Sequence, residues 1–446
     1  MKEISHIFRS YDIRGIYKKD LDEAVMDKIG NVLAQLGDNI AVAMDMRLSS
    51  EGLRKSLIAG IVEAGRDVHD LGLIPMGAAM FYSWKNKLTL AYITASHLPG
   101  EWNGVKFFHS NGVGFVEEEN FKIRDMVIAD KTTKEKKKGK VSKVSNKGII
   151  EDYRQYLISK IKIKKKLSVV IDCGNGMASM IAKNLFNKAG FSATSIFDKL
   201  DGNFPNRNPE PSEDPLTELG NQIEKDGADL GVAYDGDADR MVIVDDKKRK
   251  LSPEQVSYLV LKELLKTESG QIIANVECSR VLDDIAKNFG KDVIRVRVGH
   301  PYIVSEVHKQ KAAFGVESAG HYVVPNIVPF DDALAVSFYA VCVLSKMDKK
   351  ISEIADEVMK YPFERINFEC SDDKKFKVIE DLKNQFSKEY EINSIDGVRI
   401  DLPEGWILIR ASNTEPVIRL TIEATSQEEF EKLKDKFSKI LEEEIK

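Results

Sequence analysis

The apolar and polar residues of this chain predict a regular alternation of strands and helices. Short apolar runs, typical of buried strands, are followed by helical segments that end in a glycine. These helix ends fall at Gly65, Gly190 and Gly290. Glycine suits such positions because it adopts the left-handed conformation without a Cβ clash. The pattern therefore predicts three copies of one strand–helix–strand unit.

Each copy is expected to contain three strands, the last of which runs into a polar loop. The first strands are residues 40–44, 168–172 and 271–276, the second are 67–71, 192–197 and 293–298, and the third are 88–93, 229–234 and 312–316. Strands that alternate with helices indicate α/β domains with mainly parallel sheets. Such sheets bind ligands beyond the carboxyl ends of their strands. We therefore expect the polar loops, which begin at Thr94, Asp235 and Glu317, to face one cleft.

The C-terminal part follows a different pattern. Residues 374–388 and 428–445 are predicted as helices, and the segments between them, 397–402, 406–410 and 417–424, alternate like strands. The predicted fold class is α/β, with three similar α/β domains of mainly parallel mixed sheets and a smaller C-terminal α+β domain around a central cleft. The predicted domains are residues 1–150, 151–250, 251–364 and 365–446.

Composition is that of an ordinary globular protein, with 446 residues, of which 43% are hydrophobic and 31% charged. A net charge of −5 gives no reason to expect a nucleic-acid partner. The most apolar run, residues 333–344, is shorter than the ~20 residues of a membrane helix and predicts a buried helix, so no membrane partner is expected. Four dispersed cysteines and an N-terminus without the apolar stretch of a signal peptide predict a cytoplasmic location. The oligomeric state is not indicated.

The first polar loop contains a candidate nucleophile. Ser96 follows an apolar strand, beside His97 and before a proline turn, where its hydroxyl could attack an electrophile. The alternative is a turn serine that bonds its own backbone. Lys106 follows Gly104 and could neutralise a phosphate or move a proton, or could be a surface lysine of a strand. The loop has no GxSxG motif, so acyl chemistry of the hydrolase type has little support.

The second polar loop carries the strongest local signal. Asp235, Asp237 and Asp239 alternate with small residues and could converge on one hard cation such as Mg²⁺. An acidic hairpin turn is the alternative. However, three carboxylates between two apolar strands would repel one another unless a cation neutralised them. Arg240 adds a positive charge that could hold a transferring phosphoryl group.

Two further loops carry candidate substrate-binding groups. In residues 315–321 a carboxylate could accept hydrogen bonds from two vicinal hydroxyls, although a surface glutamate and a core histidine fit equally well. Residues 410–416 offer a guanidinium, hydroxyls, an amide and turn N–H groups, a set that suits a phosphate dianion. Arg419 lies just beyond and could reinforce this set. The alternative for this segment is a polar hairpin turn.

Together these motifs resemble the α-D-phosphohexomutase family, which includes phosphomannomutase/phosphoglucomutase and phosphoglucosamine mutase. The resemblance spans nearly the whole chain and rests on five motifs in order, at residues 8–15, 94–99, 235–240, 317–321 and 410–416. It implies an isomerase that interconverts hexose 1-phosphate and hexose 6-phosphate through a phosphoserine and a bisphosphorylated sugar. It also implies Mg²⁺ as cofactor, a hexose 1,6-bisphosphate as activator and small sugar phosphates as partners.

The resemblance further implies a role for each motif residue. Ser96 would carry the phosphoryl group and would hold Mg²⁺ together with Asp235, Asp237 and Asp239. The other residues implied to act in catalysis are Arg14, His97, Lys106, Arg240 and His300. Those implied to bind substrate are Tyr11, Arg47, Glu317, Ser318, His321, Arg410, Ser412, Asn413, Thr414 and Arg419. Three of these residues are candidates for the general base, namely His97, Lys106 and His300.

Three positions depart from the usual pattern of the family. Leu98 replaces an asparagine, Ala319 replaces a serine, and Arg207 stands where histidine is common. These changes bear on substrate choice more than on reaction class. Mannose and glucose phosphates are favoured as substrates by the Arg-Ala-Ser-Asn-Thr sequence from Arg410, and phosphoglucosamine mutase is the alternative. A metal-dependent sugar-phosphate phosphatase and a non-catalytic sugar-phosphate sensor are more distant alternatives.

Overall fold

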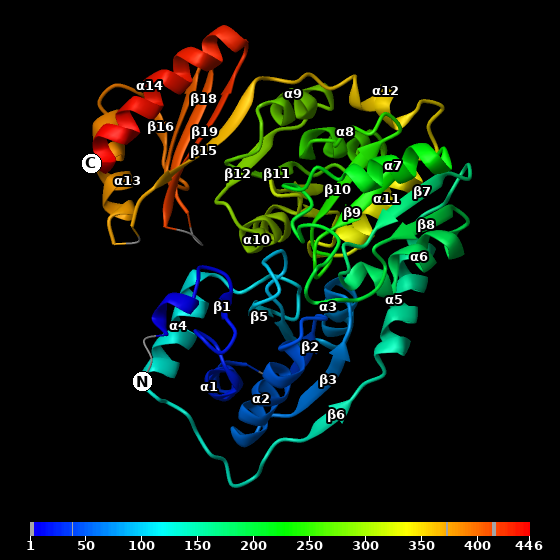
Figure 1. The fold of residues 1–446 in the computed structure, drawn as a ribbon, viewed down its shortest axis with the longest axis vertical. Helices are drawn as coiled ribbons and strands as arrows, with labels where there is room; N and C mark the ends of the chain where they lie inside the picture. Colours follow the sequence, from blue (N-terminus) through cyan, green and yellow to red (C-terminus); the bar gives the residue numbers. More distant parts are fainter. Residues whose placement is uncertain (1–3, 38, 372, 413–415) are drawn as a thin grey trace.

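The computed structural model describes residues 4–37, 39–371, 373–412 and 416–446. The chain forms four sheets, each with its own helices (Figure 1). Residues of all four domains line a central cleft. Three sheets mix parallel and antiparallel strand pairs, and the fourth is antiparallel, which confirms the predicted fold class. Among the described residues, no helix has the length and apolar composition needed to cross a membrane.

Domain I holds a six-stranded sheet in the order β1-β5-β4-β2-β3-β6. Its strands are β1 (Ile13–Ile16), β2 (Ile40–Met44), β3 (Val68–Leu73), β4 (Thr89–Ile93), β5 (Trp102–Phe108) and β6 (Val141–Lys143). β2 is parallel to β3 and β4, whereas β5 is antiparallel to β4 and β1. Side chains alternate between two buried faces, as expected of a sheet with helices on both sides. One face is covered by α1 (Glu23–Leu36), α2 (Ser50–Glu63) and α4 (Glu117–Ile128), the other by α3 (Met76–Asn86) and α5 (Asn146–Lys160).

Domains II and III each have a four-stranded sheet, with orders β10-β9-β7-β8 and β12-β11-β13-β14. The strands of domain II are β7 (Ser168–Asp172), β8 (Ser192–Ile196), β9 (Leu230–Tyr234) and β10 (Met241–Asp245). Those of domain III are β11 (Ile272–Asn275), β12 (Val293–Val296), β13 (Phe314–Val316) and β14 (Tyr322–Val323). Their helices are α6 (Ala182–Ala189), α7 (Thr217–Asp226), α8 (Pro253–Leu264), α9 (Val281–Asn288) and α10 (His300–Gln310). In both sheets a polar loop joins a parallel strand to its antiparallel neighbour, β9 to β10 and β13 to β14.

A single buried helix joins these three domains. α11 (Ala333–Leu344), predicted as a buried helix, has every residue buried. It lies in a core shared with α3 of domain I, β10 of domain II, and α8 and β14 of domain III. A helix that is apolar all round has to be covered on all sides. This shared core fixes the first three sheets, and with them the loops at their strand ends, relative to one another.

Domain IV is an antiparallel sheet in the order β15-β19-β18-β17-β16. Its strands are β15 (Phe363–Glu369), β16 (Ile392–Asn393), β17 (Val398–Leu402), β18 (Gly405–Ala411) and β19 (Val417–Ala424). One face packs on α13 (Lys375–Phe386) and α14 (Gln427–Ile445). Trp406 and Leu408 of β18 contact Val276 of domain III on the other face. β15 was not predicted because it is an edge strand with no buried residue, so its apolar signal is weak.

Candidate active site

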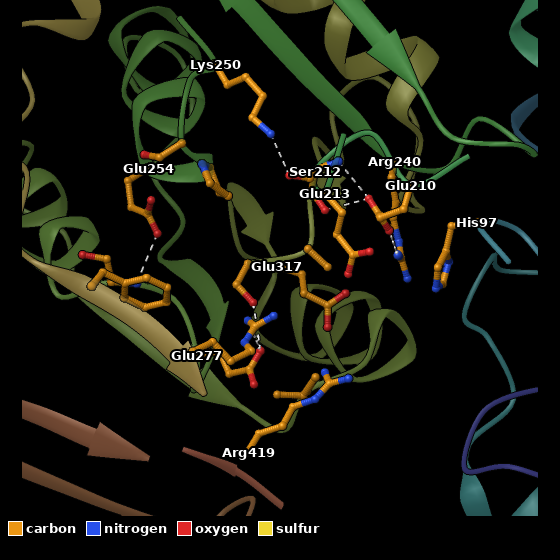
Figure 2. Close-up of a pocket in the computed structure, with 18 of the residues that line it drawn as sticks. His97, Glu210, Ser212, Glu213, Arg240, Lys250, Glu254, Glu277, Glu317 and Arg419 are labelled. Carbon is orange, nitrogen blue, oxygen red and sulfur yellow. Dashed lines mark hydrogen bonds and ion pairs between the residues drawn. The ribbon is translucent and has the colours of Figure 1, made fainter. Parts of the chain in front are cut away.

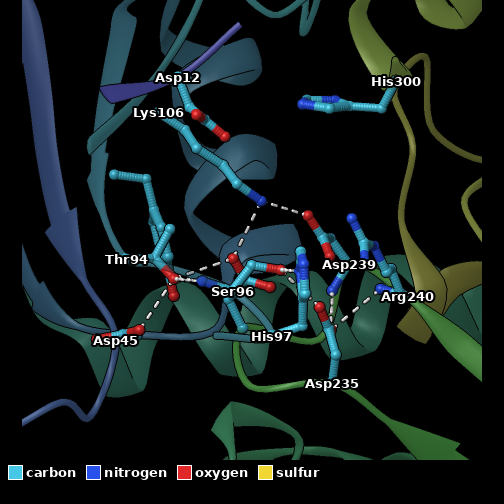
Figure 3. A network of polar contacts seen from close by, with 12 residues as sticks. Asp12, Asp45, Thr94, Ser96, His97, Lys106, Asp235, Asp239, Arg240 and His300 are labelled. Carbon is cyan, nitrogen blue, oxygen red and sulfur yellow. Dashed lines mark hydrogen bonds and ion pairs between the residues drawn. The ribbon is translucent and has the colours of Figure 1, made fainter. Parts of the chain in front are cut away.

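Ser96 lies in the loop after β4, with its hydroxyl turned toward domain II (Figure 3). Its Oγ donates to Oδ2 of Asp235 at 2.7 Å and lies 3.2 Å from Nδ1 of His97. The backbone N–H of Ser96 donates to Oγ1 of Thr94 at 2.8 Å. The φ angle of Ser96 is +49°, a left-handed conformation that is uncommon for serine. The loop therefore holds a fully buried hydroxyl in one orientation, beside the acidic loop.

The acidic loop between β9 and β10 brings Asp235, Asp237 and Asp239 together. One carboxylate oxygen from each lies within 4.8 Å of the others, and all three side chains are buried. Oδ1 of Asp237 and Oδ1 of Asp239 have no hydrogen-bond partner among the described residues. Burial raises the pKa of Asp235 well above its usual value, and burial together with Asp239 raises the pKa of Asp237. Burial raises the pKa of Asp239 too, but Lys106 and His321 lower it by more, so this carboxylate is ionised. Three buried carboxylates with two unpartnered oxygens among them fit a hard divalent cation, which would neutralise them.

Two cationic side chains flank the acidic loop. Lys106 of β5 is buried, so it is not a surface lysine, and its Nζ donates to Oδ2 of Asp239 at 2.6 Å and to Oδ2 of Asp237 at 3.2 Å. Burial lowers the pKa of Lys106, but the two carboxylates raise it by more, so the ammonium stays charged. Arg240 follows the loop and forms an ion pair with Glu210. Both cations lie where charge on a transferring phosphoryl group could be stabilised.

Arg47 lies behind the serine loop. An arginine has five N–H groups to donate. In Arg47, Nε donates to Oδ2 of Asp45 at 3.1 Å, and the two terminal nitrogens donate to the backbone carbonyls of Ser96, Leu98, Pro99 and Trp102. All five donors are thus bound within the protein. The structure therefore places the guanidinium of Arg47 on the serine loop, and the expected substrate contact of Arg47 stays a prediction.

The N-terminal motif reaches the site through Tyr11 and Arg14. A terminal guanidinium nitrogen of Arg14 in β1 lies 2.6 Å from Oδ2 of Asp12. Burial and the charge of Glu317 raise the pKa of Tyr11 to about 12, so its phenol stays protonated. The ring of Tyr11 meets the ring of His300 edge-on, with 5.8 Å between centroids. Domain I therefore supplies a neutral hydroxyl donor, the phenol of Tyr11, and the guanidinium of Arg14, in addition to the guanidinium of Arg240 from domain II.

Domain III contributes a charged pair of side chains. Nδ1 of His321 lies 2.7 Å from Oε2 of Glu317, and Nε2 of His321 lies 3.5 Å from Oδ2 of Asp239. Burial lowers the pKa of His321, but Asp239 and Glu317 raise it to about 10. Burial raises the pKa of Glu317, but the hydrogen bond from His321 brings it to about 2. His300, at the start of α10, stacks on His321 with 5.4 Å between ring centroids, and its Nδ1 lies 3.2 Å from Oδ2 of Asp331.

Domain IV places Arg410 at the end of β18. Its Nε donates to Oε1 of Glu277 at 2.6 Å, and both side chains are buried. The carbonyl of Ser412 accepts a hydrogen bond from Nζ of Lys375 at 2.6 Å. Asn413 and Thr414 lie outside the described residues, so their expected phosphate contacts stay predictions.

A cleft of about 920 Å³ joins these groups and has a volume typical of small-molecule sites (Figure 2). The predicted site residues that line it are Tyr11, Arg14, His97, Arg240, Glu317, Ser318, Arg410, Ser412 and Arg419. Leu98 and Ala319, two of the departures from the family pattern, line it as well. Six further predicted residues are buried next to residues that line the cleft. They are Ser96, Lys106, Asp235, Asp237, Asp239 and His300.

The sequence analysis gave no role to several charged residues of the cleft wall, among them Arg9, Glu210, Glu254, Glu277 and Arg365. It also gave no separate role to Thr94, which binds the serine loop to two carboxylates. Locally these residues look like ordinary surface charges or turn residues. The available signal was that Glu277 and Thr94 directly follow predicted strands.

Four family models match consecutive parts of the chain. They are described as phosphoglucomutase/phosphomannomutase alpha/beta/alpha domain I (residues 5–134), domain II (150–248) and domain III (252–361), and the C-terminal domain (366–440). A probable phosphoglucosamine mutase of Methanothermobacter thermautotrophicus is 36% identical over 397 residues, 87% of this chain and 86% of the relative. A phosphomannomutase/phosphoglucomutase of Pseudomonas putida is 32% identical over 452 residues, 97% of this chain and 94% of the relative. The crystal structure of a phosphoglucomutase/phosphomannomutase family protein from Burkholderia thailandensis has a TM-score of 0.89 at 27% identity, covering 99% of this chain and 98% of that chain.

Proposed function

The chain belongs to the phosphoglucomutase/phosphomannomutase family of mutase isomerases, and we propose that it interconverts hexose 1-phosphates and hexose 6-phosphates through a phosphoryl group carried by Ser96. One observation supports this most directly. Oγ of Ser96 lies 2.7 Å from Oδ2 of Asp235, although the two residues are 139 positions apart in the chain. A nucleophile, an acidic loop and a guanidinium-rich wall are thus collected at one cleft.

In the proposed reaction, the phosphoryl group of phosphorylated Ser96 passes to the free hydroxyl of a hexose phosphate. The P–O bond to Ser96 breaks and a P–O bond to the sugar oxygen forms. The proton of the sugar hydroxyl passes by way of a nearby base to Oγ of Ser96, and His97 and His300 are the candidates for this base. Lys106 is already protonated and cannot accept the proton. The bisphosphorylated sugar then turns in the cleft, and its other phosphoryl group returns to Ser96. A hexose 1,6-bisphosphate would therefore activate the unphosphorylated enzyme.

The acidic loop is proposed to hold Mg²⁺. Asp235, Asp237 and Asp239, with an oxygen of phosphorylated Ser96, would be its ligands. When bound, such an ion neutralises charge on the transferring phosphoryl group. Arg240 is held beside the loop by its ion pair with Glu210 and provides a fixed positive charge on the cleft side.

Mannose and glucose phosphates are proposed as the substrates, with glucosamine phosphates as the alternative. Similar proteins carry both kinds of name, so the relatives do not separate the two. In the cleft, ionised Glu317 can accept hydrogen bonds from sugar hydroxyls, whereas both ring nitrogens of protonated His321 face carboxylates, those of Glu317 and Asp239. Arg410 is proposed to bind the phosphate that does not react. A coupled assay with the 1- and 6-phosphates of mannose, glucose and glucosamine decides between the two substrate classes.

Replacement of Ser96 tests the nucleophile directly. Ser96→Ala should abolish bisphosphate-dependent turnover, and intact-mass spectrometry should show no phosphorylated protein after incubation with hexose 1,6-bisphosphate. Ser142→Ala, at an exposed position of β6 in the same domain, is the matched control and should behave as wild type. Unchanged turnover in Ser96→Ala would refute the assignment. Release of inorganic phosphate in place of an isomer would instead indicate the phosphatase alternative.

A further inference from the structure

Glu277 follows β11 and places its carboxylate among donors from two domains (Figure 2). Its Oε1 accepts from Nε of Arg410 at 2.6 Å. Its Oε2 accepts from a terminal nitrogen of Arg365 at 2.8 Å and from Oγ of Ser318 at 3.1 Å. The residue is 3% exposed and lines the cleft. Burial raises its pKa, but Arg410 and Arg365 lower it by more, so the carboxylate is ionised.

The hydrogen bond from Nε fixes the plane of the Arg410 guanidinium. A guanidinium is planar and rigid, so holding its Nε edge also determines where its terminal nitrogens lie. Burial lowers the pKa of Arg410, and Glu277 is the main group that raises it again. The same carboxylate holds Ser318, the neighbour of the proposed sugar ligand Glu317. Glu277 therefore links the proposed phosphate-binding loop of domain IV to the proposed sugar-binding loop of domain III.

The chain around Glu277 is bound by domain IV on both sides. The carbonyl of Val276 accepts a hydrogen bond from Arg399 of β17. The backbone N–H of Arg280 donates to Oε1 of Glu423 of β19 at 3.0 Å. These contacts anchor the backbone of Glu277 at the interface, so its carboxylate keeps a defined position relative to both domains.

We propose that Glu277 is a positioning residue that sets the spacing between the sugar-binding and phosphate-binding loops, and thereby sets the KM for the hexose phosphate. The inference rests on the proposed mutase function. Simple Coulomb attraction predicts the opposite effect, because removal of a carboxylate beside two arginines would strengthen binding of a phosphate dianion. Positioning and Coulomb attraction thus give opposite signs for one substitution.

Glu277→Gln separates the two effects because it keeps the size of the side chain. Its amide has one oxygen acceptor in place of two, and its NH₂ group cannot accept from a guanidinium. We expect KM for the preferred hexose phosphate to rise about tenfold, as for the loss of one well-oriented charge-assisted hydrogen bond. Ser96 phosphorylation and kcat should change less than about twofold. Glu364→Gln, which changes a half-buried carboxylate of β15 next to Arg365 that pairs with Lys434, is the matched control.

A KM equal to or below that of wild type in correctly folded Glu277→Gln would overturn the inference. Correct folding is checked by thermal unfolding, and if the variant does not fold, Arg365→Met removes one contact from the other side and should raise KM by a smaller factor. Calorimetric titration with inorganic phosphate separates this inference from the proposed function. If no hexose phosphate is isomerised, the proposed function fails. In that case, weaker binding of inorganic phosphate to Glu277→Gln than to wild type still supports the positioning role of Glu277. Unchanged or tighter binding refutes that role.

Discussion

Thr94→Val is the substitution that most directly tests how the serine loop is held. Oγ1 of Thr94 accepts the N–H of Ser96 at 2.8 Å and lies within donating distance of two carboxylates, Oδ2 of Asp45 at 2.9 Å and Oδ2 of Asp237 at 3.1 Å. One buried hydroxyl therefore contacts the backbone of Ser96, an acid of domain I and an acid of domain II. Valine has nearly the same shape as threonine but lacks the hydroxyl.

The expected effect follows from the groups left without a partner. A buried N–H that loses its acceptor costs about 1–3 kcal/mol. The left-handed backbone of Ser96, itself unfavourable by about 1–2 kcal/mol, then loses the bond that holds it. We expect the free energy of unfolding to fall by about 2 kcal/mol and kcat to fall by about 10–100-fold, since each factor of ten is about 1.4 kcal/mol of barrier. KM should change little, because Thr94 is 1% exposed.

Urea unfolding and the coupled mutase assay measure these two quantities, and intact-mass spectrometry reports the phosphorylated fraction of Ser96. Thr94→Ser keeps the hydroxyl and should retain most of kcat. Thr89→Val, at the other end of β4, is the control for the valine side chain. Wild-type stability together with wild-type kcat in Thr94→Val would refute the reasoning, because the hydroxyl would then have no role in holding the loop.

Two further predictions concern buried charges. Asp332→Asn should raise the free energy of unfolding by about 1–3 kcal/mol at about pH 8, as measured by urea unfolding across pH. Burial raises the pKa of Asp332 to about 7 in the folded protein. The neutral carboxyl therefore stabilises the fold, fully so below the pKa that Asp332 has in the unfolded chain. This stabilisation is lost as the pH rises through about 7, where the buried carboxyl ionises. An identical pH dependence in variant and wild type would contradict this. Arg47→Lys should lower kcat about tenfold and change KM less than about twofold, because three ammonium donors cannot replace five guanidinium donors, of which four bind the serine loop and one binds Asp45. A rise in KM alone, in steady-state kinetics, would indicate a substrate contact instead.

The sequence carried enough local information to predict the architecture. Apolar runs predicted β2, β7 and β11, the first strands of the three repeats, since these strands are buried on both faces. The uniform apolarity of residues 333–344 likewise predicted a helix covered on all sides. β15 escaped prediction because an edge strand is exposed and its residues need not be apolar.

The sequence by itself also determined the acidic loop and the candidate serine, because the residues that identify each of them are close together in the sequence, directly after a predicted strand. Only the tertiary structure decided that Ser96 is hydrogen-bonded to Asp235, that the terminal nitrogens of Arg47 donate to backbone carbonyls of the serine loop, and that Glu277 of domain III binds Arg410 of domain IV. Periodicity and loop composition report on neighbours within one element. Arg47 and Ser96 are 49 positions apart and meet through the folding of domain I. The contacts of Ser96 with Asp235 and of Glu277 with Arg410 depend on how four sheets pack around α11 and across the interface of domains III and IV, and no local pattern encodes that packing.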